Sequence, residues 1–509
     1  MSTVRTWAVA LTGVDGHLVE VEADLSNQTP DFRIIGLPDK SLGEAVQRVH
    51  NACKNAGLDL PRRKLTVNLS PASLPKQGSS FDLAIAVTAL AAGGAIASQP
   101  IRQVVHIGEL ALDGRLRPVP GVLPAVLAAA RAGFDTVVVP FANAVEAALV
   151  PGIEVRSATT LAEVAAWHGA DVVVPDVEPA EPAALEPSGS DDLDLADVAG
   201  QEEAVDALVV AAAGGHHMLL SGPPGAGKTM LARRLPGILP ALTVDEALDV
   251  ASIRSLTGQV VDALDRRAPL EAPHHSASVA ALVGGGSRSA RPGAIARAHR
   301  GVLLLDEAAE FSRVALDALR QPLEEGSIDV HRSGFTARFP ARFQLVMAMN
   351  PCPCGNYGAR GGECTCPSLA IRRYAARLSG PLRDRVDIEL HVSRISTAAA
   401  ASDRSSRLTS ADAQRRVVSA RARAAERWHG TPWRRNADVP GTRLRQADVR
   451  VGADARAPLD RALEKGLLTL RGYDRVLRLA WTMADLDGVE RPGRDQVGRA
   501  LFLKRGFLA

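Results

Sequence analysis

Three short apolar runs stand in the middle of the chain, at residues 218–220, 302–305 and 343–349. A continuous apolar run of this length predicts a strand that is buried on both faces of a parallel sheet. Polar residues follow each run. Because parallel strands present their carboxyl ends at one edge of the sheet, where ligands of α/β proteins bind, we expect these polar residues to form a single site.

Residues 1–170 alternate between strand-like and helix-like apolar spacing, which predicts a separate α+β domain. Two strands are expected within 4–21, where Gly13 and Asp15-Gly16 signal turns, and further strands at 65–69, 104–112 and 136–140. Helices are expected at 40–57, 81–92 and 120–132.

Two changes of composition mark the ends of the central part of the chain. Residues 171–195 hold four prolines and many acidic residues but no Lys or Arg, which predicts an extended linker. Residues 395–509 are helical in pattern, and Lys and Arg exceed Asp and Glu there by about ten. That surplus suits an anionic partner, although a solvated charged face is the alternative.

The length of 509 residues fits about three domains of roughly 150 residues. We expect an α/β protein with an α+β domain at 1–170, a linker at 171–195, a P-loop module with a parallel sheet at 196–394 and a helical lid at 395–509. The apolar content of 46% is sufficient for packed cores. The most membrane-like segment, 83–97, is too short to span a bilayer, so we expect a cytoplasmic protein without a membrane partner.

Residues 222–229 read GPPGAGKT and fit the phosphate-binding pattern G-x-x-x-x-G-K-[ST]. The glycines let the backbone curl so that its N–H groups point at phosphate oxygens. Lys228 is expected to reach the β- and γ-phosphates of ATP, and the Thr229 hydroxyl to ligate Mg²⁺. The residues expected around the nucleotide are Gly222, Pro223, Pro224, Gly225, Ala226, Gly227, Lys228 and Thr229.

Two carboxylates and an amide follow the other apolar runs. Asp306 is expected to hold Mg²⁺ through water, and Glu307 to polarise the attacking water. Asn350 could orient the same water. Together with the phosphate-binding loop, this arrangement predicts an ATPase.

Four of the five cysteines crowd into residues 352–366, as two C-x-C pairs around a glycine-rich loop. They are Cys352, Cys354, Cys364 and Cys366. Four thiolates at such spacing favour a structural Zn²⁺ site, although C-x-C is tighter than the usual C-x₂-C. The alternatives are two disulfides or four free thiols. A catalytic metal is disfavoured because four protein ligands leave no open position.

A long stretch, 236–300, separates the phosphate-binding loop from the second apolar run. Gly284-Gly285-Gly286 is expected to be the flexible tip of an inserted loop. His274 and His275 could be metal ligands or active-site residues. A structural or contact role is favoured, because adjacent side chains point different ways and no third ligand is close in sequence.

Residues 326–342 predict a hairpin with its turn at Ser333-Gly334. The hairpin carries His331, Arg332, Arg338 and Arg342. Arginine on a projecting hairpin suits DNA phosphates, and a solvated charged hairpin is the equal alternative. Arg385, within LSGPLRDRVD, is expected to stabilise charge at a neighbouring subunit's γ-phosphate rather than to form an ordinary surface ion pair. Arg471 opens the amphipathic helix at 467–488 and is a candidate to reach the nucleotide from the lid.

Two segments of the first domain, PKQGSSFD at 75–82 and GELALDGRLRPVPGVLPAVLAAA at 108–130, resemble the peptidase domain of Lon proteases. The resemblance places Ser80 at the position of the nucleophile. Residues 122–126, where the activating lysine of Lon would fall, contain no lysine. A serine without an adjacent base is a poor nucleophile, so we expect a peptidase-like fold without peptidase activity.

Over nearly its full length the chain resembles the YifB/ComM family of magnesium-chelatase-like AAA+ ATPases. The resemblance rests on GPPGAGKT, PHHSAS with LVGGG, GVLLLDE, AMNPCPCG, LSGPLRDRVD and LRGYDR, together with the Lon-like domain. It implies a hexameric ring with ATP at subunit interfaces, Asn350 as a γ-phosphate sensor, Arg385 acting in trans and Arg471 in the lid. It also implies DNA branch migration, as a helicase-type factor in recombination or transformation. The alternatives are a chelatase-type motor that remodels a protein and, less favoured, an ATP-dependent peptidase.

Overall fold

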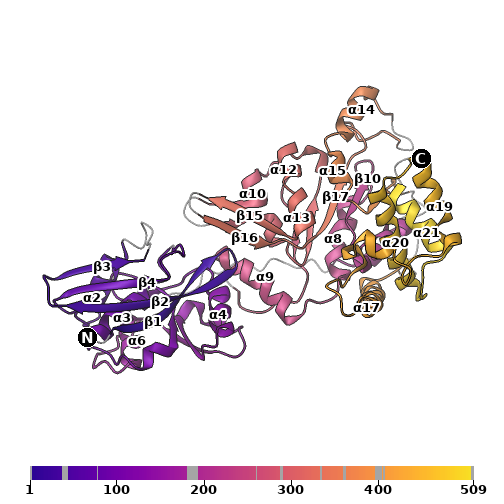
Figure 1. Ribbon diagram of the computed structural model, residues 1–509. Helices are drawn as coiled ribbons and strands as arrows, with labels where there is room; N and C mark the ends of the chain where they lie inside the picture. The colour runs from indigo at the N-terminus through magenta and orange to yellow at the C-terminus, as the bar shows by residue number, and fades with distance from the viewer. Residues whose placement is uncertain are drawn as a thin grey trace.

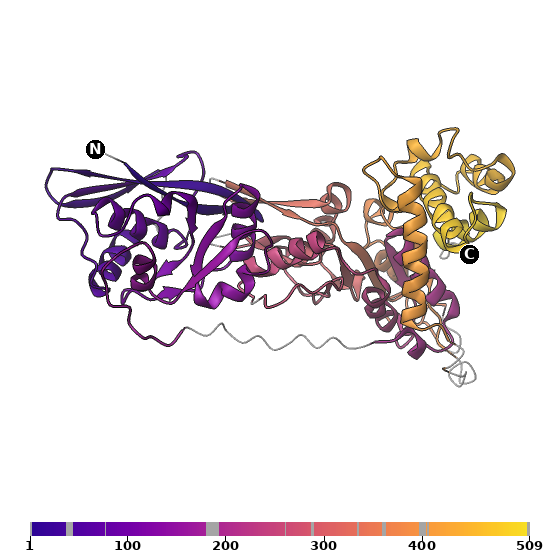
Figure 2. The ribbon, with the colours of Figure 1, turned by 90° about the horizontal axis from the view of Figure 1, so that it is seen from below.

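The computed structural model describes residues 3–36, 44–76, 78–179, 193–259, 261–286, 290–332, 335–358, 363–395, 404 and 407–505. Figures 1 and 2 show three units in a row: an N-terminal sheet with its helices, a central unit around a second sheet, and a set of C-terminal helices. Three expected features lie partly or wholly outside the described residues: the linker at 180–192, the start of the first helix at 40–43, and the hairpin turn at 333–334.

The N-terminal unit is built on a seven-stranded mixed sheet in the order β3-β4-β2-β1-β5-β8-β9. The strands are β1 (Val4–Thr12), β2 (Asp15–Ser26), β3 (Asp31–Ile35), β4 (Lys64–Ser70), β5 (Val104–His106), β8 (Thr136–Pro140) and β9 (Glu154–Ala158). Its longer helices are α2 (Ala45–Asn55), α3 (Asp82–Ala92), α4 (Val122–Arg131) and α6 (Leu161–Trp167). Helix α3 is apolar all round and buried from Asp82 to Ala91, so it lies in the core of the unit.

One expected strand of this unit is interrupted. Residues 104–112 form β5 and the separate two-residue strand β6 (Glu109–Leu110). Between them Gly108 donates its N–H to Ser80 O at 3.0 Å, and Leu83 donates to Gly108 O at 3.1 Å. Because both backbone groups of Gly108 are satisfied by the start of α3, the segment leaves the sheet there.

The central unit contains a five-stranded parallel sheet in the order β11-β14-β17-β10-β18. Its strands are β10 (Met218–Ser221), β11 (Leu270–Glu271), β14 (Val302–Leu305), β17 (Gln344–Met349) and β18 (Ile388–His391). Every residue of β10, β14 and β17 is buried, as the three apolar runs predict. These strands are neighbours in one sheet, so their carboxyl ends meet at one edge.

Helices flank this sheet and lead into it. They include α7 (Glu202–Gly214), α8 (Lys228–Ile238), α9 (Val244–Leu256), α11 (Ala294–Arg297), α12 (Arg313–Asp317), α13 (Arg320–Glu325), α14 (Ser368–Ala375) and α15 (Gly380–Arg383). Helix α9 begins with a capping box, in which Thr243 and Glu246 each accept a hydrogen bond from the other's backbone N–H.

The central unit also contains two small antiparallel ribbons. Helix α10 (Val279–Val283) leads into β12 (Gly284–Gly285), which pairs with β13 (Arg291–Pro292). The expectation of a flexible glycine tip is therefore wrong for Gly284 and Gly285, because a strand partner fixes their backbone. The predicted hairpin forms as β15 (Ser327–Arg332) paired with β16 (Phe335–Pro340), and Arg338 makes a two-bond ion pair with Asp329 across it.

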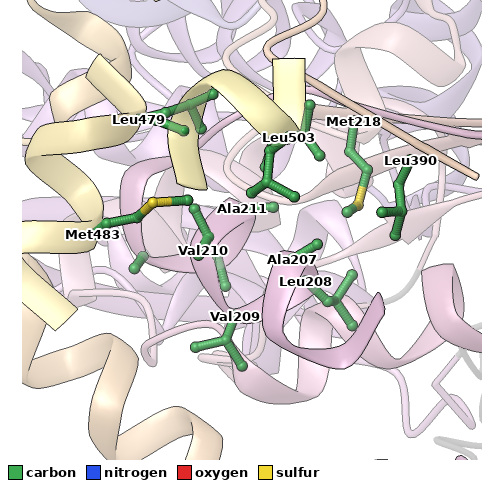
Figure 3. Close-up of a cluster of buried hydrophobic side chains, with 14 of the residues drawn as sticks. Ala207, Leu208, Val209, Val210, Ala211, Met218, Leu390, Leu479, Met483 and Leu503 are labelled. Atoms are coloured by element: carbon green, nitrogen blue, oxygen red, sulfur yellow. The ribbon is translucent and has the colours of Figure 1, made fainter. Parts of the chain in front are cut away.

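The C-terminal helices share one buried core with the central sheet and with α7 and α8. They are α17 (Ser410–Arg427), α19 (Ala453–Glu464), α20 (Leu470–Asp487) and α21 (Arg494–Arg505). Figure 3 shows their shared core, where Leu479, Met483 and Leu503 of α20 and α21 lie beside residues of α7 and the sheet strands. Because one continuous core joins these helices to the sheet, they and the central unit form a single packed body.

The N-terminal unit contacts the central unit through α4 and α9. Leu123 and Val126 of α4 share a buried cluster with Leu248 and Ala251 of α9. Gly121, just before α4, donates its N–H to Ser255 O at 3.1 Å. Helix α4 spans the region where the Lon-like pattern would carry a lysine, and its apolar side chains form this contact instead.

Candidate nucleotide-binding site

The loop at residues 222–227 joins β10 to α8, and its glycines are required by its shape. Gly225 and Gly227 adopt positive φ of 76° and 88°. A Cβ on Gly222 would lie 2.0 Å from Val392 O. Since a larger residue at 222 would collide with the backbone after β18, the close approach of these two chain segments depends on this glycine.

Lys228 begins α8 and closes the loop. Its Nζ donates to Gly222 O at 2.7 Å and to Pro223 O at 3.0 Å, and lies 3.2 Å from Asn350 Oδ1 at the end of β17. Burial lowers the pKa of Lys228, while the nearby carboxylates of Asp306 and Glu307 act in the opposite direction. The lysine therefore draws the loop and the end of β17 together.

Thr229 and Asp306 meet beside this lysine. The Thr229 hydroxyl donates to Asp306 Oδ2 at 2.8 Å, and the Glu307 N–H donates to Asp306 Oδ1 at 3.0 Å. Mg²⁺ prefers oxygen ligands such as a hydroxyl and a carboxylate. When Mg²⁺ also binds the phosphates of a nucleotide, the protein supplies only a few of its ligands. The donor set therefore fits Mg²⁺ held together with a nucleotide.

Glu307 has an unusual backbone and an unexpected partner. Its φ and ψ of 52° and 44° are left-handed, which is rare for a residue other than glycine. Its Oε2 lies 3.0 Å from His275 Nδ1. His274 instead pairs with Ser276 Oγ at 2.7 Å. The expectation that these adjacent side chains point different ways is wrong, because their imidazole rings lie against each other with centroids 4.1 Å apart. His275 also contacts Glu307 in the candidate site.

The two expected arginines lie outside the group formed by Lys228, Asp306 and Glu307. Arg385 has a side chain that is 14% exposed; it forms an ion pair with Glu324 and donates to Pro381 O at 2.7 Å. Arg471 is exposed at the start of α20. Among the contacts that the structure describes, neither arginine touches the phosphate-binding loop of its own chain.

Sequence reasoning missed several residues that support the site. Gln201 donates to Ser393 O at 2.6 Å and to Ala226 O at 3.4 Å, which ties the segment before α7 to the loop. Arg475, one helical turn after Arg471, forms an ion pair with the buried Asp387. The Arg475 guanidinium and the neighbouring His216 hold the pKa of that carboxyl well below its usual range, against the opposing effect of burial. Arg475 could have been found from the sequence, because it follows Arg471 by four residues and residues i and i+4 lie on the same face of a helix.

The four clustered cysteines converge in space. Cys352 Sγ lies 3.4 Å from Cys354 Sγ and 3.8 Å from Cys364 Sγ, and all four sulfur atoms lie within 4.8 Å of one another. Zn–S bonds of about 2.3 Å in a tetrahedron give S–S separations of about 3.8 Å. Disulfide-bonded sulfurs would be about 2 Å apart. The cluster therefore has the spacing of a closed tetrathiolate site.

This cysteine segment lies against the phosphate-binding loop. Cys352 follows Asn350 by two residues, and a Cβ on Gly355 would lie 2.5 Å from Pro224 Cδ. Arg394 also approaches both parts, with Nε 3.4 Å from Pro224 O and Nη2 3.5 Å from Asn356 Oδ1. The conformation of the cysteine segment therefore affects the position of the phosphate-binding loop.

Comparison with known proteins decides the family. Three family models match consecutive parts of the chain: "Subunit ChlI of Mg-chelatase" at 21–143, "Magnesium chelatase, subunit ChlI" at 194–400, and "Magnesium chelatase, subunit ChlI C-terminal" at 407–504. Competence protein ComM of Haemophilus influenzae is 41% identical over 98% of this chain and 97% of its own. The chain belongs to the YifB/ComM family. It is thus an AAA+ ATPase of the magnesium-chelatase-like type.

Other members of the YifB/ComM family are similar over comparable lengths. An uncharacterized protein of Mycobacterium tuberculosis is 48% identical over 99% of both chains. YifB of Escherichia coli is 39% identical over 96% of this chain and 94% of its own. A Lon protease of Mycolicibacterium smegmatis is 28% identical over 34% of this chain and 23% of its own, which supports the Lon-like element of the fold. Within the described residues, the structure contains no helix with the length and apolarity needed to span a membrane.

Proposed function

We propose that the protein is an ATP-driven ring motor that acts on DNA in the cytoplasm, as a branch-migration or helicase factor in recombination or transformation. The observation that carries the proposal is similarity over 98% of the chain to a protein named for competence. Hydrolysis of ATP at the candidate site provides the free energy for this action. The basic surplus of residues 395–509 suits a phosphate backbone.

We propose the following roles for the residues of the candidate site during ATP hydrolysis. Mg²⁺, when bound by Thr229 and Asp306, supplies positive charge at the β- and γ-phosphates. Lys228 and the N–H groups of the loop bind the phosphates. Glu307 accepts the proton of the attacking water, and Asn350 orients that water beside the γ-phosphate.

We propose that the ring is a hexamer in which Arg385 serves the nucleotide of the neighbouring subunit. Arg385 is paired with Glu324 of its own chain, and that glutamate is 60% exposed. Because the Glu324 carboxylate is exposed, another anion can approach from solvent and compete for the Arg385 guanidinium. The γ-phosphate of an adjacent subunit would be such an anion. Arg471, exposed on α20, is proposed to reach the nucleotide from the lid.

We propose that Cys352, Cys354, Cys364 and Cys366 hold a structural Zn²⁺. Their sulfur atoms are close enough to share one ion, and four protein ligands leave no open position for catalysis. Because the two pairs converge, the ion would fix a segment in which Gly355 lies against Pro224. Zinc would therefore stabilise one wall of the ATP site.

The hairpin gives the DNA proposal only limited support. Arg338 forms an ion pair with Asp329 within the hairpin, so its charge is already neutralised there. Arg342 is exposed and available to a phosphate, and His331 is exposed as well. The side chain of Arg332 lies outside the described residues.

The second candidate is a chelatase-type ATPase that remodels a protein partner. It is favoured by the three family models, which all carry the name of a magnesium chelatase subunit. A peptidase is disfavoured, since α4 is apolar and packs on α9 where an activating lysine would be required.

Steady-state ATP hydrolysis tests the proposal directly. Turnover is measured alone and with single-stranded, duplex and four-way-junction DNA, across a salt series. DNA action predicts stimulation that fades steeply as salt rises, because phosphate contacts release counterions. A flat response with every DNA would contradict it and would favour the protein-remodelling ATPase.

A further inference from the structure

Helix α14 projects from the central unit, near the top of the view in Figure 1. Four residues of this helix are exposed, namely Ser368, Leu369, Arg372 and Arg373. Their spacing places them on a single face, because an α-helix completes a turn in about 3.6 residues. The helix therefore presents to solvent one face that carries two adjacent arginines and a leucine.

The opposite side of α14 is anchored to the central unit. Tyr374 is buried in the same apolar cluster as Leu305 of β14. Arg377, just after the helix, donates to Ala309 O at 2.9 Å and to Glu310 Oε2 at 2.8 Å. Because these contacts fix α14 on the central unit, its exposed face keeps one orientation.

Arg372 and Arg373 differ from Arg377 in having no side-chain partner within the described part of the chain. Residues 367–379 contain these three arginines but no Asp or Glu. A guanidinium offers a planar fork of N–H donors that matches the geometry of a phosphate group. The exposed face of α14 is therefore suited to an anion that carries phosphates.

The cysteine cluster places an exposed aromatic ring at the start of this helix. Cys352 Sγ accepts the Tyr357 N–H at 3.4 Å and lies 3.8 Å from Cys364 Sγ. Cys366, the last member of the cluster, is separated from α14 by a single proline. The cluster thus holds the backbone of Tyr357 close to the first turn of α14, and the side chain of Tyr357 is exposed.

We infer that the exposed face of α14, together with Tyr357, binds single-stranded DNA. Arg372 and Arg373 bind the phosphates, and the Tyr357 ring stacks on a base. Proteins that bind single strands without sequence preference combine cations along the backbone with aromatic rings on which bases stack. The inference rests on the proposed action on DNA, and it names a surface for that action outside the β15–β16 hairpin.

Binding of fluorescein-labelled oligo-dT to the full-length protein, with a non-hydrolysable ATP analogue present, tests the arginines. Arg372→Gln/Arg373→Gln should raise the Kd by about tenfold or more, because two phosphate contacts are lost. The slope of log K against log salt should become shallower by about 1.4, since each phosphate of a single strand contributes about 0.7. Arg372→Lys/Arg373→Lys keeps both charges and should retain most of the affinity.

The same titration tests the aromatic ring. Tyr357→Leu should raise the Kd for oligo-dT by about fivefold or more and leave the salt slope unchanged, because stacking involves no phosphate. Tyr357→Phe keeps the ring and should bind like the parent. Equal affinities in the parent and the leucine variant would remove Tyr357 from the surface.

Arg62→Gln/Arg63→Gln is the matched control for the arginines. Arg62 and Arg63 are also adjacent and exposed, but they lie in the N-terminal unit. This control should bind oligo-dT like the parent. An equal loss of affinity in the control and in Arg372→Gln/Arg373→Gln would mean that total charge, and not α14, sets the binding, which would overturn the inference.

Further results separate this inference from the proposed function. Unchanged binding in Arg372→Gln/Arg373→Gln would exclude α14 as the DNA surface and leave the proposed DNA function standing. Dissociation of that variant into smaller assemblies, measured by light scattering, would show that α14 contacts a second copy of the chain instead. A parent that binds duplex but not oligo-dT would contradict the single-strand assignment. A parent that binds no DNA of any form would contradict both proposals.

Discussion

Lys228 Nζ lies 3.2 Å from Asn350 Oδ1, which joins the phosphate-binding loop to the end of the adjacent strand. The two residues follow β10 and β17, whose register places Leu220 opposite Ala348. The backbone hydrogen bonds between these strands thus fix the relative positions of the lysine proposed to bind phosphate and the amide proposed to sense it. The register of the sheet therefore sets the spacing of these two positions.

Lys228→Ala should raise the Kd for ATP by about tenfold or more, because it removes the cation at the β- and γ-phosphates. Titration with a fluorescent ATP analogue measures the effect. Asn350→Ala is the companion variant: it should keep binding and lose turnover. Normal ATP affinity in the lysine variant would contradict the assignment of this loop.

Glu307→Gln should bind ATP with near-normal affinity but hydrolyse it about 10²–10⁴ times more slowly, because an amide cannot take the proton of the attacking water. Single-turnover hydrolysis separates the chemical step from binding. Glu310→Gln is a suitable control, since Glu310 pairs with Arg377 beyond the end of β14. A wild-type rate in the Glu307 variant would remove it from this role.

Arg385→Ala should keep ATP binding and lose most of its turnover, by about 10³ on the precedent of arginines at transferring phosphoryl groups. Mixed with Glu307→Gln chains in equal amounts, it should recover activity, because about a quarter of randomly formed head-to-tail interfaces then combine an intact Glu307 with an intact Arg385. Turnover of the mixture, after exchange of subunits, is the measurement. A mixture no faster than its two components would argue against action in trans.

Metal analysis of purified protein should find about one zinc per chain. Cys354→Ser should lower both the zinc content and the ATP turnover, since the cysteine segment contacts Pro224. Cys53→Ala is the control, because Cys53 is buried in the N-terminal unit and lies outside the cluster. Metal-free protein that is stable and fully active would exclude the proposed site.

His217 should make the protein less stable as pH falls. Its Nδ1 accepts the Leu345 N–H at 3.0 Å, and burial lowers the pKa of His217 from 6.5 to about 4. Between these values the unfolded chain binds a proton that the folded chain does not. Stability is therefore complete above about pH 6.5 and declines toward pH 4, at up to about 1.4 kcal/mol per pH unit for this one group.

His217→Asn checks this dependence, since the amide oxygen can accept the same N–H but does not titrate. Urea unfolding at several pH values between 7 and 4.5 should show a shallower loss of stability in the variant. His106 and His299, whose pKa values are also lowered by burial, account for part of the remaining slope. Equal slopes in parent and variant would contradict the assignment.

The sequence was sufficient to predict the central sheet and the group of polar residues that meet at its carboxyl edge. Strand burial, the glycine pattern and the polar residues after each strand are local signals, and the parallel arrangement follows from them. Thr229 and Asp306, 77 residues apart, meet at 2.8 Å for this reason. The four cysteines were found in the same way, because their ligand spacing lies within a single short segment.

Contacts that depend on long-range packing could not be predicted. The pairing of His275 with Glu307 depends on the position of β11 at the sheet edge, and a two-residue strand leaves almost no periodic signal. The ion pair between Arg475 and Asp387 depends on the packing of α20 against the sheet. The break between β5 and β6 depends on hydrogen bonds from Gly108 to the start of α3, which no pattern in 104–112 reveals.

The contact between the N-terminal and central units depends on the absence of a side chain. Gly121 has a φ of 79°, and a Cβ there would lie 2.5 Å from Leu11 Cδ1 and 3.0 Å from Leu256 Cδ2. One added methyl group would thus press on both units at once, far from the nucleotide. A change in ATP turnover when that single carbon forces the units apart would show that the candidate ATP site is mechanically coupled to the Lon-like unit.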